Sequence, residues 1–427
     1  MMRILFTVFA SRAHMYNLVS LAWALRSAGH EVRVASQPDM VDTITATGLP
    51  AVAVGNPLDM GGSWRGKGTW NQEVLSRGLA SPYTEERRRD WGHVLGEFTL
   101  ACGVRYEFLA DQAMTDDLVR FACSWRPDLV VWDALTFAGP IAALASGAAH
   151  ARLLFGLDYI GRLYDDFVRL RDRQPPERRD DPLADWFTGR LSRIGLDYDP
   201  AMAEELITGQ WTIDPMPEWM RLPTSRHHVP VRYVPYNGPS SIPAWVHRPP
   251  AKPRVCLTLG VSLREQLGRV MVSADELLRA LAELDIELIA TLDASQLSSA
   301  AVPDNVTVVD FVPLNELLPS CSAIIHQAGF GTHSNAVAHG VPSIVIPDPY
   351  WDEAECGRLF EKRGAGLCLP PEDFTPQALA AMLCRLLDDP SYRANARELQ
   401  RELLAAPTPR EVVPVLEELT LARRSAG

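Results

Sequence analysis

Two residues that could exchange protons follow two apolar runs that the sequence predicts to be strands. His14 follows the run RILFTVF at 3–9, and Asp133 is the last residue of the run PDLVVWD at 127–133. Parallel strands end together at one edge of a sheet, and open α/β sheets bind their ligands at that edge. We therefore expect His14 and Asp133 at the same edge, with the carboxylate placed to orient the imidazole. The alternatives are a turn histidine without a role and an aspartate that only caps its strand.

A glycine-containing turn is the second candidate for chemistry. The stretch AIIHQAGFGTHSNAVAHGVPSIVIP at 323–347 predicts a strand, a turn and a helix that starts near Gly331 or Thr332. A helix N-terminus offers unpaired backbone N–H groups and the positive end of the helix dipole, which suit a diphosphate. Gly329 and Gly331 would let the backbone approach the phosphates, and Thr332 could both cap the helix and donate to a phosphate oxygen. Glycines that serve only to turn the chain are the alternative.

Strand and helix signals alternate on both sides of a proline-rich stretch, which predicts two α/β domains with parallel sheets. Proline density rises sharply at 215–253, and because proline removes a backbone donor and blocks helices, we expect an extended linker there. Apolar runs bounded by polar turns indicate strands that are buried on both faces. The expected strands are 3–9, 30–36, 127–133, 151–156, 254–260, 286–293, 306–312, 323–329 and 343–347.

The composition of the chain disfavours several classes of protein, among them nucleic-acid-binding and membrane proteins. The 427 residues suggest two domains, and 53 acidic against 41 basic residues give a formal net charge of −12. Such a surface disfavours nucleic acid and anionic membranes as partners. No apolar run reaches the roughly 18 residues of a membrane span, and the N-terminus reads as a strand and not as a signal peptide. Seven scattered cysteines without CxxC spacing indicate a reducing, cytoplasmic location with neither a disulfide framework nor a zinc site.

The glycine-containing turn resembles the donor-binding signature HHGGxGT of the two-domain GT-B glycosyltransferases, especially those of antibiotic biosynthesis. The chain is most similar to the macrolide and polyketide transferases that use TDP-deoxysugars. The resemblance implies an α/β fold of the GT-B type, with two Rossmann-like domains facing each other across a cleft. The further segments that carry the resemblance are FTVFASRAH, SLAWALRSAGHEVRVAS, WRPDLVVWDALTFAG, TGQWTIDPMPEWMRLP, VPYNG, FVPLNELLPSC, GVPSIVIP and YWDEAECGRLFEKRGAG.

The resemblance also assigns the domains. It implies that the first domain binds the acceptor and the second binds the nucleotide sugar, and that a last helix packs back on the first domain. The expected ranges are 1–222 for the acceptor domain, 223–250 for the linker, 251–405 for the donor domain and 406–427 for the last helix.

By the same resemblance, His326, Gly329, Gly331 and Thr332 line the nucleotide diphosphate. The chain departs from the signature at Gln327, where a second histidine is usual, and at Ala328, which replaces a glycine. A glutamine can donate through its amide but cannot become cationic. We therefore expect weaker diphosphate contacts or compensation by a neighbour such as His333.

Three further donor contacts follow from the resemblance. Asp352, with Glu353 beside it, falls where the family places an acidic contact to the sugar hydroxyls, because a carboxylate accepts strongly from hydroxyls. Capping of the helix that starts near Glu353 is a compatible alternative for Asp352. Ser262 lies in the loop that approaches the donor from the linker side, and Leu314 and Asn315 lie where the family packs the base.

The resemblance makes His14 the general base that deprotonates an acceptor hydroxyl, with Asp133 as its orienting partner. A neutral alcohol is a poor nucleophile, and a histidine titrates near working pH. The expected reaction is transfer to a hydroxyl of a polyketide or macrolide-type acceptor, with inversion at the anomeric carbon. It needs no metal and no cofactor, since the TDP-sugar is a co-substrate. A C-glycosyltransferase acting on an aromatic acceptor, and an inactive binding or scaffold protein favoured by Gln327, remain open.

Two other classes of enzyme fit less well. A metal-dependent glycosyltransferase needs an Asp-x-Asp pair, and Asp197-Tyr198-Asp199 has that spacing, but no clear strand precedes it, so we interpret it as a solvated loop. A nicotinamide dehydrogenase needs GxGxxG, and the turn GFGTHS lacks the third glycine.

Residues 57–125 form the least regular region and carry many aromatic side chains. We interpret them as helices that pack their aromatics, with an acceptor cleft or a partner surface as the alternative. Several members of the family work with a helper protein that resembles a haem-thiolate oxygenase without its haem. The resemblance therefore predicts such a helper against this region, and a homodimer is a further possibility.

Overall fold

The computed structural model describes residues 1–58, 87–260, 272–292, 302–348 and 351–426. Two compact units divide the chain: unit 1 comprises Met1–Arg232 and Pro407–Gly427, and unit 2 comprises Tyr233–Ala406. The division at 232/233 lies inside the proline-rich stretch.

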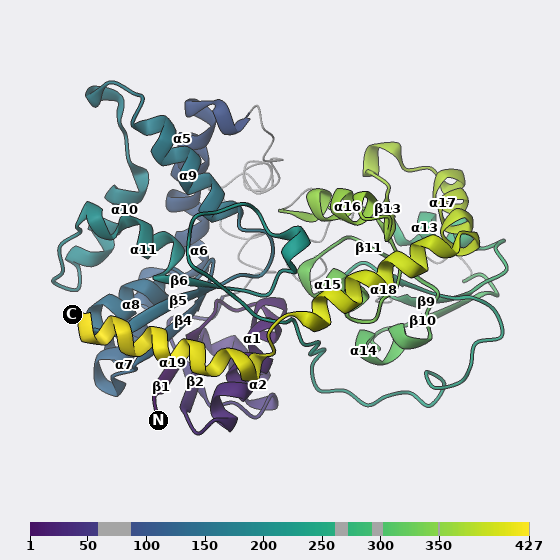
Figure 1. Ribbon diagram of the computed structural model, residues 1–427, viewed down its shortest axis with the longest axis horizontal. Helices are drawn as coiled ribbons and strands as arrows, with labels where there is room; N and C mark the ends of the chain where they lie inside the picture. Colours follow the sequence, from purple (N-terminus) through teal and green to yellow (C-terminus); the bar gives the residue numbers. More distant parts are fainter. Residues whose placement is uncertain (59–86, 261–271, 293–301, 349–350, 427) are drawn as a thin grey trace. The chain divides into compact units, whose positions relative to one another are not determined.

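Unit 1 is built on a seven-stranded parallel sheet with the strand order β3-β2-β1-β4-β5-β6-β7 (Figure 1). The central strands are buried on both faces, which explains why the segments 3–9 and 127–133 read as apolar runs. The strands are β1 (Arg3–Thr7), β2 (Glu31–Ser36), β3 (Ala51–Ala53), β4 (Leu129–Asp133), β5 (Ala149–Leu153), β6 (Trp211–Asp214) and β7 (His228–Pro230). The α-helices are α1 (Arg12–Ser27), α2 (Val41–Ala46), α5 (Trp91–Leu100), α6 (Tyr106–Leu109), α7 (Gln112–Trp125), α8 (Ala138–Ser146), α9 (Tyr159–Arg171), α10 (Pro182–Ser192), α11 (Ala203–Thr208) and α19 (Pro409–Ala426), and a π-helix, η3 (Ala101–Arg105), joins α5 to α6.

A close contact between α8 and β4 fixes the sheet edge of unit 1. A Cβ atom added to Gly139 would lie 2.3 Å from Cβ of Trp132 and 2.9 Å from Cγ2 of Thr7, so only glycine fits there. The segment that precedes α8 is also bonded to the segment that follows β1, because the backbone N–H of Phe9 donates to Oγ1 of Thr136 (2.9 Å). The segments that follow β1 and β4 are therefore held side by side.

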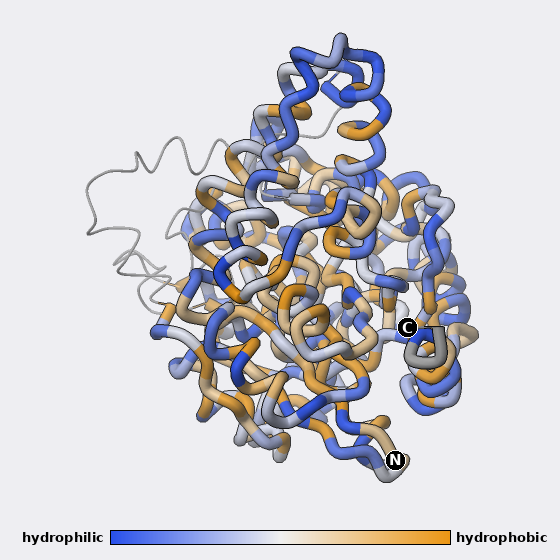
Figure 2. Tube along the Cα trace, turned by 90° about the vertical axis from the view of Figure 1, so that its left-hand side faces the viewer, coloured by the Kyte–Doolittle hydropathy of each residue, from blue (hydrophilic) through white to orange (hydrophobic). Residues whose placement is uncertain are grey.

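The last helix of the chain belongs to unit 1. The backbone N–H of Arg232 donates to the carbonyl of Pro407 (2.7 Å) where the chain returns, and α19 then packs against α1 and β5 (Figure 1). Its Glu417 pairs with Nε2 of the buried His30 (3.0 Å). Near the C-terminus the trace alternates between hydrophilic and hydrophobic colours, as expected of a helix with one buried face (Figure 2).

Unit 2 is built on a six-stranded parallel sheet with the order β10-β9-β8-β11-β12-β13. A capping box between Ser273 and Glu276 starts the helix α13, and the side chain of Asn237 accepts from the backbone of Asn315 (2.7 Å), which ties the proline-rich stretch to α14. The strands are β8 (Arg254–Thr258), β9 (Glu287–Thr291), β10 (Val306–Val309), β11 (Ala323–His326), β12 (Ser343–Val345) and β13 (Gly366–Cys368). The α-helices are α13 (Ala274–Leu281), α14 (Leu314–Leu317), α15 (Phe330–Ala338), α16 (Glu353–Lys362), α17 (Pro376–Asp388) and α18 (Pro390–Ala405).

All seven cysteines lie in the described part of the chain, and none of them forms a disulfide. Within the same residues, every helix is too short or too polar to cross a membrane.

The contact at Gly139 gives a test of the sheet edge. We expect Gly139→Ala to lower the free energy of unfolding by about 1–3 kcal/mol, because the added methyl group overpacks a rigid contact. The matched control is Gly96→Ala in α5, where a Cβ would meet nothing within 4 Å; it should be neutral or stabilising by up to about 1 kcal/mol. Chemical denaturation of both variants measures the difference, and equal stabilities would contradict the tight contact.

Candidate active site and donor site

The first candidate site lies where β1 and β4 end beside each other. The two strands are parallel neighbours, with Thr7 opposite Trp132. Asp133 is the last residue of β4, and His14 is the third residue of α1, which starts five residues after β1 ends. The edge predicted from the sequence therefore brings these two side chains together.

His14 and Asp133 form a short hydrogen bond. Nδ1 of His14 lies 2.7 Å from Oδ2 of Asp133, and the two side chains are 14% and 5% exposed. The other carboxylate oxygen accepts from the backbone N–H of Leu135 (3.0 Å). An ionised carboxylate only accepts hydrogen bonds, so the proton of a neutral His14 lies on Nδ1. Nε2 then keeps its lone pair, which is the arrangement that a general base needs.

Two aromatic rings enclose the imidazole. The ring centroids of Phe9 and Phe155 lie 4.6 and 4.3 Å from that of His14. These rings limit the rotation of the imidazole, and they leave the hydrogen bond to Asp133 as the polar contact that sets its orientation.

The glycine-containing turn joins β11 to α15 in unit 2. The helix starts at Phe330, and its N-cap residue Gly329 has no side chain that could accept a hydrogen bond from the first turn. Thr332 is the third helical residue, and its backbone N–H donates to the carbonyl of Gly329 (2.9 Å). The prediction that Thr332 caps the helix is therefore wrong, because the helix begins earlier in the chain than expected.

The two glycines of the turn have open space beside them. A Cβ at Gly329 or Gly331 would meet nothing within 4 Å, and neither residue has a positive φ. Among the described residues, neither packing nor backbone conformation requires glycine at these positions, and the open space would let a ligand approach the backbone. By contrast, Ala328 has a φ of 68°, a strained value for a residue with a side chain, at the position where the signature carries a glycine.

The two histidines of this region are buried. Nδ1 of His326 accepts from the backbone N–H of Ala328 (2.9 Å), so a neutral ring carries its proton on Nε2. His333 is 1% exposed and packs edge-on against Phe330 and Phe360. Burial lowers the pKa of both histidines to about 3. His333 is therefore neutral and does not supply the positive charge that Gln327 lacks.

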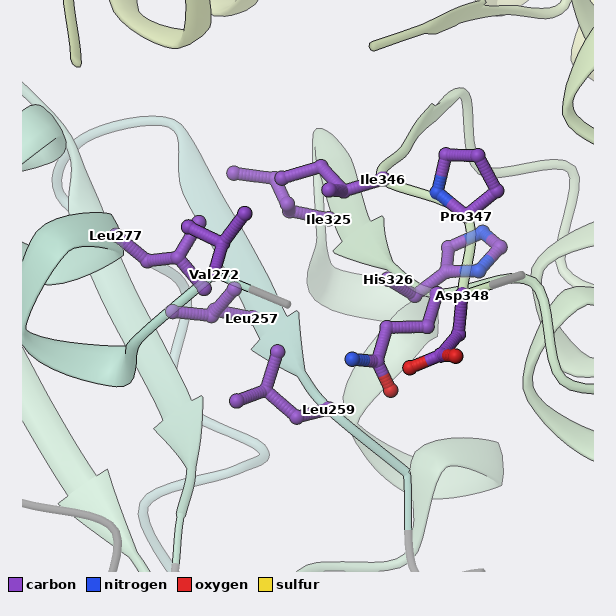
Figure 3. A pocket seen from close by; sticks show the side chains of 10 residues that line it. Leu257, Leu259, Val272, Leu277, Ile325, His326, Ile346, Pro347 and Asp348 are labelled. Atoms are coloured by element: carbon purple, nitrogen blue, oxygen red, sulfur yellow. The ribbon is translucent and has the colours of Figure 1, made fainter. Parts of the chain in front are cut away.

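A pocket opens at the carboxyl edge of this sheet, and sequence reasoning missed one of its residues. Apolar side chains such as Leu257 and Leu277 line one side, and His326 and Asp348 lie on the other (Figure 3). Gln327 also lines this pocket. Asp348 follows the strand-like run SIVIP as Asp133 follows the run LVVW, so the strand-end position that selected Asp133 could also have selected Asp348.

Polar atoms in this pocket lack hydrogen-bond partners among the described residues. They are both carboxylate oxygens of Asp348, Oε1 of Gln327 and Nε2 of His326. Asp348 is only 2% exposed, and burial raises its pKa to about 7. A buried polar group without a partner costs free energy, so this arrangement favours a ligand that supplies one.

The start of α16 holds two more carboxyl groups. Asp352 stands at the N-cap position of α16, as the capping alternative predicts, but its side chain makes no capping hydrogen bond. Oε2 of Glu353 accepts from the backbone N–H of Trp351 (2.7 Å). Burial and the negative charges of Asp352 and Asp348 raise the pKa of Glu353 to about 8.

The remaining predicted residues lie elsewhere. Ser262 falls in 261–271, outside the described residues. The side chain of Asn315 lies 3.0 Å from Nε2 of His339 at α14. In the Asp-x-Asp sequence, Asp199 accepts from the backbone N–H of Ala201 (2.9 Å) and starts the short helix η5 (Pro200–Met202), which gives it a structural role.

Comparison with known proteins identifies the family. Residues 23–260 match the N-terminal domain of erythromycin biosynthesis protein CIII-like proteins, and residues 275–419 match the C-terminal domain. The chain belongs to the EryCIII-like glycosyltransferase family. It is therefore a nucleotide-sugar-dependent glycosyltransferase, as the glycine turn and its surroundings predict.

Relatives of this EryCIII-like transferase cover its full length. It is 49% identical to aclacinomycin-T 2-deoxy-L-fucose transferase of Streptomyces galilaeus, over 99% of the chain and 97% of the relative. It is 48% identical to 10-deoxymethynolide desosaminyltransferase of Streptomyces venezuelae, over 99% and 98%. The crystal structure of the glycosyltransferase VinC in complex with dTDP is similar over 100% of both chains, with 42% identity and a TM-score of 0.87. These matches confirm the predicted α/β fold of the GT-B class.

The buried Asp348 makes a prediction about pH. An acid with a higher pKa in the folded than in the unfolded chain costs stability when it ionises, so stability falls as pH rises from about 4 to above 7. Asp348→Asn should therefore gain stability over the wild type at pH 8.5, by up to about 4 kcal/mol, and much less at pH 5. The substitution also removes the negative charge of Asp348 that acts on Glu353, and this loss of repulsion further increases the stability of the variant at pH 8.5.

Thermal unfolding at both pH values measures this effect. Asp373→Asn, at an exposed position, is the matched control and should keep the wild-type pH dependence. A pH-independent difference between Asp348→Asn and the wild type would show that Asp348 is not a buried, unpaired carboxyl group.

Proposed function

We propose that this transferase moves a deoxysugar from a TDP-sugar to a hydroxyl of a polyketide natural product of the macrolide or anthracycline type. The displacement is single, inverts the anomeric carbon and needs no metal ion. The 2-deoxy-L-fucose transferase and the desosaminyltransferase named above support the sugar class, and VinC with its bound dTDP supports the nucleotide.

The hydrogen bond of 2.7 Å between His14 and Asp133 carries this proposal. The acceptor hydroxyl donates its proton to Nε2 of His14 while its oxygen attacks the anomeric carbon. The bond between that carbon and the diphosphate oxygen breaks, and TDP leaves with the electron pair. Asp133 stabilises the imidazolium that forms, and the paired histidine favours an enzyme over the scaffold alternative.

The donor residues are proposed to act on the two ends of the diphosphate sugar. The first turn of α15, which has no side-chain cap, stabilises the charge of the leaving diphosphate, with Gln327 donating through its amide. Asp352 and Glu353 accept from sugar hydroxyls. Ser262 remains a predicted donor contact.

We also propose a cytoplasmic location, which the seven unpaired cysteines support. A helper protein resembling a haem-thiolate oxygenase without haem, acting through 57–125, and a homodimer remain predictions. Of that region, residues 59–86 lie outside the described part of the chain.

Substitution of the catalytic pair tests the proposal. His14→Ala should lower kcat by about 10²–10⁴-fold and leave the donor KM near its wild-type value, because the general base is lost while the donor residues of unit 2 remain. Asp133→Asn should lower kcat by on the order of 10²-fold, because an amide no longer fixes the proton on Nδ1. Steady-state kinetics with a TDP-deoxysugar measures both effects.

The control for these variants is His227→Ala, at an exposed position of unit 1, which should turn over like the wild type. Retention of more than about a tenth of kcat in His14→Ala would exclude His14 as the base.

Metal independence has its own test. A thermal-shift titration should show a rise in Tm with TDP, because a ligand of the native state stabilises it. We expect EDTA to change neither that rise nor the turnover rate. A TDP response or a turnover that EDTA abolishes and Mg²⁺ restores would contradict the metal-free displacement.

A further inference from the structure

Asn17 lies three residues after His14 in α1 and bonds the end of another strand. Its side-chain amide donates to the backbone carbonyl of Leu154 (2.7 Å), one residue beyond the end of β5. A carbonyl oxygen only accepts, so the nitrogen of the Asn17 amide is the atom that faces it. Residues three apart in a helix lie on the same face, so Asn17 and His14 both face the sheet edge.

Two side-chain hydrogen bonds thus attach the start of α1 to the ends of two neighbouring strands. His14 bonds Asp133 at the end of β4, and Asn17 bonds the carbonyl of Leu154 after β5. The strands are parallel neighbours, with Asp133 opposite Leu153. Because the two bonds are about one helical turn apart, α1 can neither rotate nor slide along its axis without breaking at least one of them.

The first turn of α1 lacks the usual side-chain stabilisation of a helix start. Its N-cap residue Ser11 makes no side-chain capping hydrogen bond, and no acidic residue occupies the first turn. Neither a cap nor a favourable charge on the helix dipole therefore stabilises the turn that carries His14. We expect the position of this turn to depend on its contacts with the sheet edge.

The same hydrogen bond also holds a ring that encloses the imidazole. The carbonyl of Leu154 belongs to the peptide group that precedes Phe155, whose ring centroid lies 4.3 Å from that of His14. On its other side, the backbone N–H of Leu154 donates to the carbonyl of Ile213 in β6 (3.0 Å). Asn17 thus connects the helix that carries the imidazole to the sheet-bound segment that carries its aromatic neighbour.

We propose that Asn17 is a positioning residue for the transfer reaction, which holds α1 and Phe155 so that Nε2 of His14 faces the acceptor hydroxyl. The inference rests on the proposed function, in which His14 is the general base. A base must lie within hydrogen-bond distance of the proton it takes, and a small displacement of the base lowers the rate steeply. Asn17 acts on the rate only through the imidazole, since it moves no proton itself.

A double-mutant cycle between Asn17 and His14 tests the proposal. Asn17→Leu nearly keeps the shape of the side chain but removes the donor. In the wild-type background we expect kcat to fall about 10-fold at an unchanged donor KM. In the His14→Ala background the same substitution should lower kcat by less than about 2-fold, because residues that act as a unit are not additive. Single-turnover kinetics with a TDP-deoxysugar and an acceptor that the wild type glycosylates measures all four chains.

Spectra of ¹⁵N-histidine at pH 8 supply a second readout, which needs no substrate. In Asn17→Leu we expect the His14 signals to move in the direction that they take in Asp133→Asn, while the signals of the other histidines stay in place. A general loss of structure would instead move the signals of all ten histidines. Asn17→Ala, which removes the donor without adding a branched side chain, then takes the place of Asn17→Leu in both measurements.

The matched control is Ser27→Leu, which introduces the same side chain at an exposed position of α1 and should match the wild type. An equal fall in kcat in both backgrounds would overturn the positioning role, and so would a wild-type kcat in Asn17→Leu with unchanged His14 signals. Both results would leave His14 as the base. A His14→Ala chain that turns over like the wild type would overturn the proposed function itself.

Discussion

The candidate active site of unit 1 depends on the hydrogen bond between Asp133 and His14. It forms only if the segments after β1 and β4 are held at one edge, which the parallel pairing of the two strands and the contact of Phe9 with Thr136 achieve. The close approach of Gly139 in α8 to Trp132 also fixes the position of β4. Because Asp133 also accepts from the following backbone, its orientation is set before any substrate arrives, as a preorganised site requires.

The sheet edge of unit 2 differs from that of unit 1 in how its polar groups are hydrogen-bonded. At its sheet edge the polar groups of Gln327 and Asp348 lack partners among the described residues, and Ala328 takes a strained backbone conformation. Such features reduce stability, and they are retained in proteins where a ligand is bound. The catalytic candidates of unit 1 are thus hydrogen-bonded to each other, whereas these polar atoms of unit 2 lack partners among the described residues.

The sequence predicted the paired site and most of the buried strands. Apolar runs indicated β1, β4, β8 and β11, whereas the buried β6 and the three-residue strands β3, β7 and β13 were missed. Asp133 followed from the rule that strands end together. Asp348 carries the same strand-end signal, but its lack of a hydrogen-bond partner is visible only in the structure, and Thr332 was misplaced because a glycine N-cap carries no side-chain signal.

The protonation state of His14 tests the account most directly. In ¹⁵N-histidine spectra of the chain at pH 8, the His14 signals are those lost in His14→Gln. In a neutral ring, the hydrogen bond to Asp133 places the proton on Nδ1 and leaves the lone pair on Nε2 free, and we expect a shift toward the other tautomer in Asp133→Asn. A wild-type ring with its proton on Nε2 would contradict the account, because that nitrogen could then not accept the acceptor's proton.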